Sequence, residues 1–197
     1  MKRHRIPGKA VTLLASLLLF SPLLRGEQAA SVTDAVNFCP GGLAFGVLAV
    51  NYEHLFHGRH GLMVRYDREE VPDTYTDAKI EASAHAFFLN YRWHPEEGME
   101  GFYFGPYLRH RTYDGSGKLD GEGFDFRITE RTVGVNMGKR WVWNSGFNLN
   151  LAFGYGTITV DRDRPADPSV RQRIGKFEKE YGNINPLYGE FSVGYAF

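Results

Sequence analysis

A strict alternation of apolar and polar residues, with a period of two, constrains the fold of this chain more than any other feature. In residues 147–156 every second residue is leucine or aromatic, and the residues between them are asparagine, alanine and glycine. Successive side chains of a β-strand point to opposite faces, so this segment predicts a strand with one apolar face and one small, polar face. Residues 130–141 and 187–197 repeat the pattern, with Lys139 as the discordant member of an apolar face.

The polar faces of these segments are rich in glycine, which separates two possible folds. A soluble β-sandwich also alternates, but its polar face meets water and favours lysine, glutamate and threonine. Glycine suits a narrow barrel interior, where side chains from opposite walls compete for space. The aromatic ends of the apolar faces are typical of strands that cross a membrane interface. The alternation therefore predicts an all-β, up-and-down antiparallel transmembrane β-barrel with its apolar face outward.

The lengths of the connections indicate how the strands follow one another. We predict strands at residues 43–56, 61–68, 79–94, 102–113, 126–143, 147–161 and 186–197. The links are short at 57–60, 95–101 and 144–146, and long and charged at 69–78, 114–125 and 162–185. Short periplasmic turns and long outer loops are the pattern of outer-membrane barrels.

This alternation of link lengths requires one more strand at the start. The strand at 43–56 ends in a short turn, so a strand that runs the other way must precede it. We place that strand at residues 31–38, with a turn at 39–42, which makes eight strands with both termini in the periplasm. If residues 31–38 stay irregular, the barrel must close with seven strands or recruit a strand from the long loop.

The N-terminus is typical of a targeting segment. Basic residues at positions 2, 3, 5 and 9 precede the apolar run at 10–20, which is too short to span a membrane comfortably. We predict a cleaved signal peptide at 1–30 and a barrel domain at 31–197; a retained anchor is the alternative. Cleavage removes five basic residues and one acidic residue and leaves 18 basic and 22 acidic residues. This balance does not indicate a nucleic-acid binder.

Cys39 is the single cysteine, so no disulfide can form within the chain.

The chain resembles the small bacterial outer-membrane β-barrel proteins, including a set without assigned function. The resemblance rests on the ending at 192–197, the aromatic segment at 101–107 and the segment at 138–146. It implies an outer-membrane location, contact with membrane lipid and lipopolysaccharide, and handling by the barrel-assembly machinery. The C-terminal signal for that machinery would be carried by Val193, Tyr195 and Phe197.

If the apolar faces point to lipid, a set of charged residues of both signs points inward. An eight-stranded barrel is wide enough for side chains to fill but too narrow for an open channel. We therefore expect a paired ionic core that stabilises the barrel; proton relay or passage of a small solute is the alternative. The predicted interior network comprises Glu53, Arg65, Asp67, Arg92, Arg109, Arg111, Glu130, Arg140 and Glu190.

No metal or cofactor site is predicted. His54, His57 and His60 recur every three residues, a spacing that groups ligands on a helix but not across a strand end and turn. The acidic loop at 114–123 lacks the ordered oxygen ligands and closing glutamate of a calcium loop, and the one at 161–167 has arginines between its acidic residues.

The function that the sequence favours is a non-enzymatic structural or surface-interaction barrel. An outer-membrane lipid-modifying enzyme of the lipid A hydrolase or transferase type is an alternative, with Ser83 and His85 on one outward face as its candidate pair. Ser116 lies between two glycines, which falls short of a nucleophile elbow, and no characteristic run of the lipid A deacylase or palmitoyltransferase barrels is present. A soluble periplasmic, lipocalin-like ligand carrier is the second alternative, and it requires the aromatic faces to point inward. The sequence leaves the ligand, the oligomeric state and ion conduction open.

Overall fold

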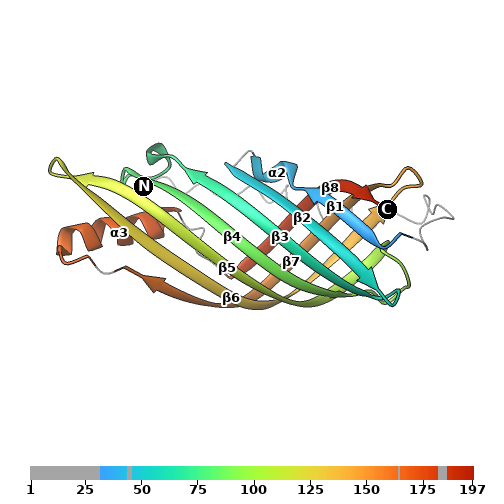
Figure 1. The fold of residues 1–197 in the computed structure, drawn as a ribbon. Coiled ribbons are helices and arrows are strands. Elements are labelled where there is room, and N and C mark those ends of the chain that lie inside the picture. The colour runs from blue at the N-terminus through green and yellow to red at the C-terminus, as the bar shows by residue number, and fades with distance from the viewer. Residues whose placement is uncertain (1–31, 44–45, 164, 182–185) are drawn as a thin grey trace, which may run out of the picture.

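The computed structural model describes residues 32–43, 46–163, 165–181 and 186–197. The predicted signal peptide at 1–30 lies outside the described residues. Eight antiparallel strands form a closed barrel in chain order (Figure 1). The strands are β1 (Asp34–Phe38), β2 (Val47–Phe56), β3 (His60–Val71), β4 (Ile80–Trp93), β5 (Gly101–Leu119), β6 (Glu122–Val142), β7 (Phe147–Arg162) and β8 (Leu187–Ala196).

The prediction of an all-β, eight-stranded antiparallel barrel is confirmed, including its first strand. β1 pairs with β2 from Asp34 to Phe38 and with β8 from Ala35 to Phe38, so it closes the ring. The short turns and the C-terminus lie at one end of the barrel, which we call the turn end (Figure 1). The longer connections lie at the opposite end, which we call the loop end.

The loop end is more ordered than the sequence analysis predicts. The predicted loop at 114–125 is wrong, because β5 and β6 continue through it as a paired hairpin from Asp114↔Arg127 to Leu119↔Glu122. Short helical turns, α2 (Pro40–Leu43) and η2 (Asp73–Tyr75), occupy two of the other connections. The segment at 162–185, expected to be a loop, contains the helix α3 (Pro168–Tyr181).

Local chemistry explains why α3 forms. Asp167 precedes the helix and accepts a hydrogen bond from the backbone N–H of Ser169 at 2.7 Å, and Pro168 stands at the first helical position, where its missing N–H costs nothing. Val170, Ile174 and Phe177 follow at helical spacing and are buried.

These side chains pack against the inward face of the strands where they extend beyond the barrel proper. The apolar cluster that results contains, among others, Ile80, Tyr113, Phe126 and Ile128 together with the buried face of α3. Burying this face holds α3 against the inner side of the extended sheet at the loop end.

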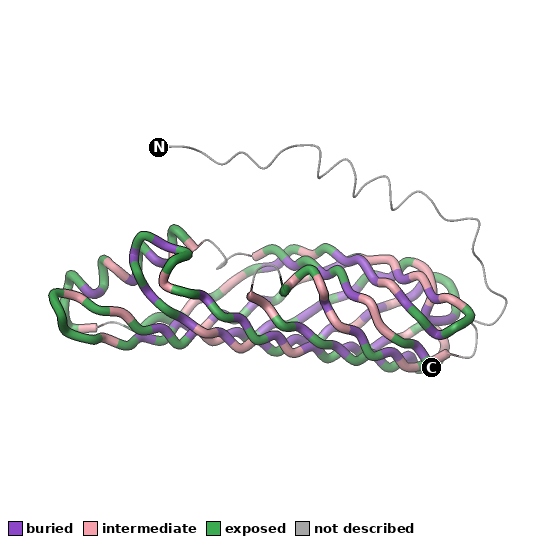
Figure 2. The backbone as a smooth tube through the Cα atoms, turned by 90° about the horizontal axis from the view of Figure 1, so that it is seen from above, coloured by how far each residue is buried: buried purple, intermediate pink, exposed green. Residues whose placement is uncertain are grey.

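Burial alternates along the strands over most of their length (Figure 2). Outward residues on β4 and β5 such as Phe87 and Phe102 are more than half exposed, whereas Arg92 and Tyr103 on the inward face are almost completely buried. The predicted apolar faces, with aromatic residues such as Phe87 and Phe102, therefore point outward, opposite to what a lipocalin-like carrier requires, although Tyr103 and other tyrosines lie inside.

Glycines on the inward face of β6 make room for tyrosine rings from β5. A Cβ placed on Gly134 would lie 2.6 Å from Cε1 of Tyr107, and one on Gly138 would meet the Tyr103 hydroxyl. This arrangement agrees with the expectation that glycine relieves crowding in a narrow interior.

Replacing Gly134 with alanine is therefore expected to destabilise the barrel by about 1–3 kcal/mol, the usual cost of overpacking an interior. The matched control is Gly189→Ala on β8, where an added Cβ meets nothing within 4 Å. Urea-induced unfolding in lipid vesicles measures both. Equal unfolding midpoints for the two variants would contradict the crowded interior.

Candidate functional site: the charged interior

The structure places all nine residues of the predicted interior network in the buried interior of the barrel. They fall into two groups along the barrel axis. The turn-side cluster consists of Glu53, Arg92, Arg140 and Glu190, and the loop-side cluster consists of Arg65, Asp67, Arg109, Arg111 and Glu130.

Glu53 on β2 is the centre of the turn-side cluster. Its Oε2 accepts hydrogen bonds from Arg92 at 2.5 Å and from Arg140 at 2.6 Å, and all three side chains have zero exposure. His94 Nε2 lies 3.4 Å from the other carboxylate oxygen. Gly61 leaves space for this carboxylate, since a Cβ there would lie 2.5 Å from Oε1. One carboxylate thus joins two guanidinium groups from strands on other parts of the ring.

Glu190 on β8 is the second acid of this cluster. It accepts a hydrogen bond from Arg92 at 2.9 Å, so Arg92 bridges the two carboxylates. Asn51, Asn150 and Ser192 also donate to Glu190, at 3.0, 2.8 and 2.8 Å. Charged and neutral donors together satisfy a carboxylate that burial alone would make costly.

The loop-side cluster is built from neighbouring strands at one level of the barrel. Arg65 donates Nε and Nη2 to the two oxygens of Asp67, at 2.6 and 2.9 Å. Glu130 lies 3.6 Å from the guanidinium groups of both Arg109 and Arg111. Charges of opposite sign therefore face one another at both levels.

Sequence reasoning missed several members of the interior network. His94 continues the inward face of Arg92, and Asn51 shares the face of Glu53, so the period-two pattern could have identified both. Glu69 is buried and accepts a hydrogen bond from Tyr181 of α3. Glu69 was not predicted as an interior residue because β3 was predicted to end at residue 68. Nothing in the local pattern indicates a partner 112 residues away.

Val193, Tyr195 and Phe197 lie outside the ionic interior. Val193 is half-buried on the outward face of β8, and Tyr195 and Phe197 are more than half exposed with rings stacked at 6.3 Å. The backbone of Phe197 bonds to Asp34 in both directions, at 2.8 and 2.9 Å. The last residue therefore also holds the seam at which the ring closes.

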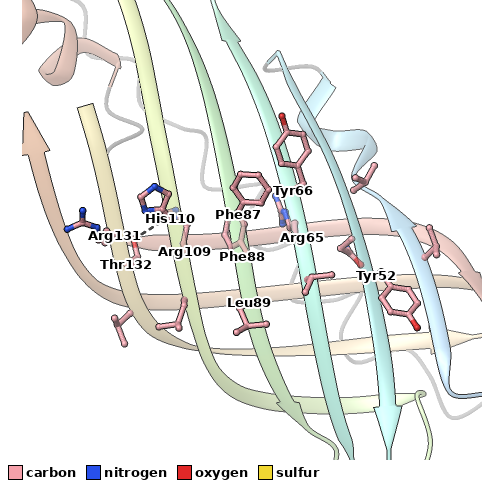
Figure 3. A pocket seen from close by; sticks show the side chains of 16 residues that line it. Tyr52, Arg65, Tyr66, Phe87, Phe88, Leu89, Arg109, His110, Arg131 and Thr132 are labelled. Atoms are coloured by element: carbon pink, nitrogen blue, oxygen red, sulfur yellow. Dashed lines mark hydrogen bonds between the residues drawn. The ribbon is translucent and has the colours of Figure 1, made fainter. Parts of the chain in front are cut away.

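The outward face carries a continuous apolar belt. Across β1 to β6 it includes a hollow of about 880 Å³, in which Tyr52, Phe87, Leu89 and other outward residues line the surface (Figure 3). Lys139, the discordant residue of the belt, places its ammonium 5.0 Å from the ring of Phe102 and 5.1 Å from that of Trp141. Its charge is thus held against aromatic faces near the turn end.

Three of the histidines considered as catalytic or metal residues have side-chain partners. His85 faces outward and its Nδ1 lies 2.6 Å from the Tyr66 hydroxyl. His54 is bound to Asp34 at 2.9 Å and His60 to Tyr91 at 2.6 Å. Within the described ranges, no three histidine, cysteine or acidic residues are grouped as a metal site would need.

No helix in the described part of the chain has the length and apolar character to cross a membrane.

A closed antiparallel ring with apolar residues outside and paired charges inside defines the class of this protein: an eight-stranded β-barrel with a polar core. Residues 72–193 match the family described as "Protein of unknown function (DUF3575)", and the chain belongs to that family.

Two solved structures from Acinetobacter baumannii are similar in fold. CarO2 is 13% identical, with 84% of this chain and 97% of that chain covered and a TM-score of 0.39. CarO is 12% identical, with 88% and 99% covered and a TM-score of 0.38. At these TM-scores both likenesses are weak. No curated protein matches the chain.

Proposed function

We propose that this protein is a non-enzymatic barrel of a bacterial outer membrane with a structural or surface-interaction role, exported through a cleaved signal peptide. The observation that carries the proposal is the inverted distribution of side chains. Large apolar residues such as Phe87, Val133 and Tyr155 are 59%, 62% and 64% exposed, while arginine and glutamate fill the interior. In water this belt would be a large unfavourable surface, but in a bilayer it faces lipid.

The dimensions of the belt support a membrane-spanning strand. On β4 the outward apolar residues run from Phe87 to Trp93, and on β7 from Phe147 to Tyr155. Beyond these limits the outward positions become polar, as at His85 and Thr157. About 9–11 tilted residues cross the apolar layer of a bilayer, which agrees with belts of seven to nine residues flanked by aromatic and polar side chains.

The interior favours a closed barrel over a channel. Glu53, Arg92 and Arg140 have no exposed side-chain surface and fill the cross-section at the turn side. The apolar core under α3 occupies part of the other end. The proposed role therefore lies in the stable barrel and in the surface of its loop end, where lipopolysaccharide and external partners would be met.

The two alternative functions have less support. A lipocalin-like carrier needs inward aromatic faces, and these faces point outward. A lipid-modifying enzyme based on Ser83 and His85 needs the histidine to act as a base for the serine, whereas His85 is bound to Tyr66.

Site-directed labelling tests the proposed location and orientation. Cys39 is only 4% exposed and should not react with the label, so a single introduced cysteine can report the accessibility of its position. With a maleimide that cannot cross membranes, we expect Glu122→Cys at the exposed hairpin tip to be labelled on intact cells. Ser145→Cys, exposed at the turn end, should be labelled only after the outer membrane is permeabilised. The opposite result, or equal labelling of both sites, would contradict the proposal.

A further inference from the structure

A cavity of about 600 Å³ lies inside the loop end, beside the loop-side cluster. Tyr75 of η2 and Glu180 and Tyr181 of α3 line it on the loop side. Its volume falls in the range of small-molecule sites. Its remaining wall includes Arg65 and Asp67 of the loop-side cluster, together with Glu69, Phe88, Tyr188 and Gly189.

Arg65 lines the cavity with a side chain that is almost fully buried. Its side chain is 8% exposed, and Asp67 takes both its Nε and its Nη2. The remaining nitrogen, Nη1, is buried and has no hydrogen-bond partner among the residues that the structure describes. A buried guanidinium N–H without an acceptor is unfavourable, so an anionic oxygen in the cavity would complete this side chain.

Aromatic rings form an apolar surface beside this donor. The guanidinium of Arg65 lies 4.9 Å from the centre of the Phe88 ring, and Arg109 lies 6.0 Å from it on the other side. Figure 3 shows Arg65 and Arg109 on the strands that flank Phe88. The Tyr188 ring packs against Phe88 at 5.7 Å. Asp67 and Glu69 also line the cavity, but Asp67 is paired with Arg65 and Glu69 accepts a hydrogen bond from Tyr181. A ligand with one anionic group and an apolar body therefore suits the wall beside Arg65.

Within the described part of the chain, the strand pairing of the barrel wall is interrupted beside the cavity. Pairing of β1 with β8 runs from Ala35↔Ala196 to Phe38↔Val193, and among the described residues β8 continues from Ser192 to Leu187 along β7 alone. α2 lies at this gap, and its Gly42 lines the cavity there. Gly189 of β8 lines the cavity on the other side of the gap. Leu187 at this point pairs with Tyr155, the last apolar residue of the belt on β7. The gap thus opens near the outer margin of the apolar belt.

We propose that this cavity binds a monocarboxylate with an apolar body, whose carboxylate accepts a hydrogen bond from Nη1 of Arg65 and whose body packs against Phe88 and Tyr188. Such a ligand has two sources. A fatty acid would enter from the lipid through the gap between β8 and β2, and a small soluble acid would enter from the aqueous side. The inference goes beyond the proposed function, because a closed membrane barrel needs no ligand.

Equilibrium binding to the full-length mature barrel in phosphatidylcholine nanodiscs tests the proposal. Radiolabelled laurate and benzoate are the two probes, with empty discs as background and dodecanol and benzyl alcohol as uncharged competitors. The test variant is Arg65→Met/Asp67→Leu. It removes both partners of the buried pair, so neither charge is left buried without its partner. The matched control is Arg68→Met/Glu70→Leu, which removes an outward, exposed pair at the same spacing on the same strand.

We expect saturable binding of one probe per barrel, weakened about tenfold or more by the test variant, because a hydrogen bond to a charged group contributes at least that much. The control variant and the uncharged competitors should leave it unchanged. Binding of laurate alone indicates entry from the lipid, and binding of benzoate indicates entry from water.

Absence of saturable binding of both probes, or equal binding by wild type and the test variant, would overturn the proposal. A heat-dependent mobility shift retained by the test variant shows that its barrel is intact. Failure of the ligand proposal is then separate from failure of the membrane-barrel proposal, in which the wild type itself would lack the shift.

Discussion

Replacing Glu53 with alanine is expected to lower the free energy of unfolding by about 3–5 kcal/mol, the usual cost of removing one partner from a buried ion pair. The reason is that Arg92 and Arg140 both donate to Glu53, at 2.5 and 2.6 Å, in a region with no exposed side-chain surface. Without Glu53, Arg140 loses its carboxylate partner, while Arg92 keeps Glu190. Urea-induced unfolding of the barrel in lipid vesicles gives this difference.

The matched control is Glu70→Ala, which removes an acid from the exposed Arg68–Glu70 pair on the outward face. That change should cost less than about 1 kcal/mol. Arg140→Ala should also destabilise the barrel, but less than Glu53→Ala, because Glu53 retains Arg92. If Glu53→Ala and Glu70→Ala had the same stability, the buried network would not be what holds the barrel interior together.

Phe197 is expected to be required for assembly into the outer membrane. Its ring ends the alternating aromatic pattern of β8, and its backbone bonds to Asp34 across the closing seam. Phe197→Glu keeps those backbone groups but places a charge where an exposed aromatic ring stood. We expect outer-membrane levels of this variant to fall to a small fraction of the wild-type level, while export across the inner membrane continues. Quantitative blotting of membrane and periplasmic fractions measures this.

The seam and the aromatic ring can be separated by further variants. Phe197→Ala removes the ring and keeps the backbone, and deletion of Phe197 removes both. Phe147→Ala, at an exposed aromatic position of the same end on β7, is the control for general loss of aromatic surface. Equal outer-membrane levels of Phe197→Ala and Phe147→Ala would mean that Phe197 has no special part in assembly.

The barrel could be predicted from the sequence because its main determinant is local. A period of two places each side chain inside or outside from its own position, which is why residues as distant as Glu53 and Arg140 were both assigned to the interior. The count of eight strands followed from the alternation of short and long connections, and β1 is present although it is only five residues long.

What could not be predicted depends on contacts between distant segments. The hairpin formed by β5 and β6 extends beyond the expected strand ends because α3 covers its inward face. The helix carried a readable signal, with Asp167 and Pro168 before apolar residues at helical spacing, but its high charge suggested a solvated loop. Which arginine binds which carboxylate depends on the relative heights of the strands, and a period-two pattern does not define this register.

The cavity was also beyond prediction from the sequence. Arg65 and Asp67 could be assigned to the interior, but the gap beside β8 follows from the short pairing of β1. That Nη1 of Arg65 has no partner among the described residues is visible only in the structure. Sequence patterns therefore identified the residue types in the interior, and the three-dimensional arrangement was needed to find a candidate binding site among them.

The central claim is that the aromatic faces meet lipid and the charges form the core, and electrophoretic mobility in detergent tests it most directly. The protein should be found in the outer-membrane fraction and should migrate differently with and without boiling, because a closed membrane barrel resists the detergent until it is heated. A soluble periplasmic protein with the same mobility before and after boiling would contradict the claim.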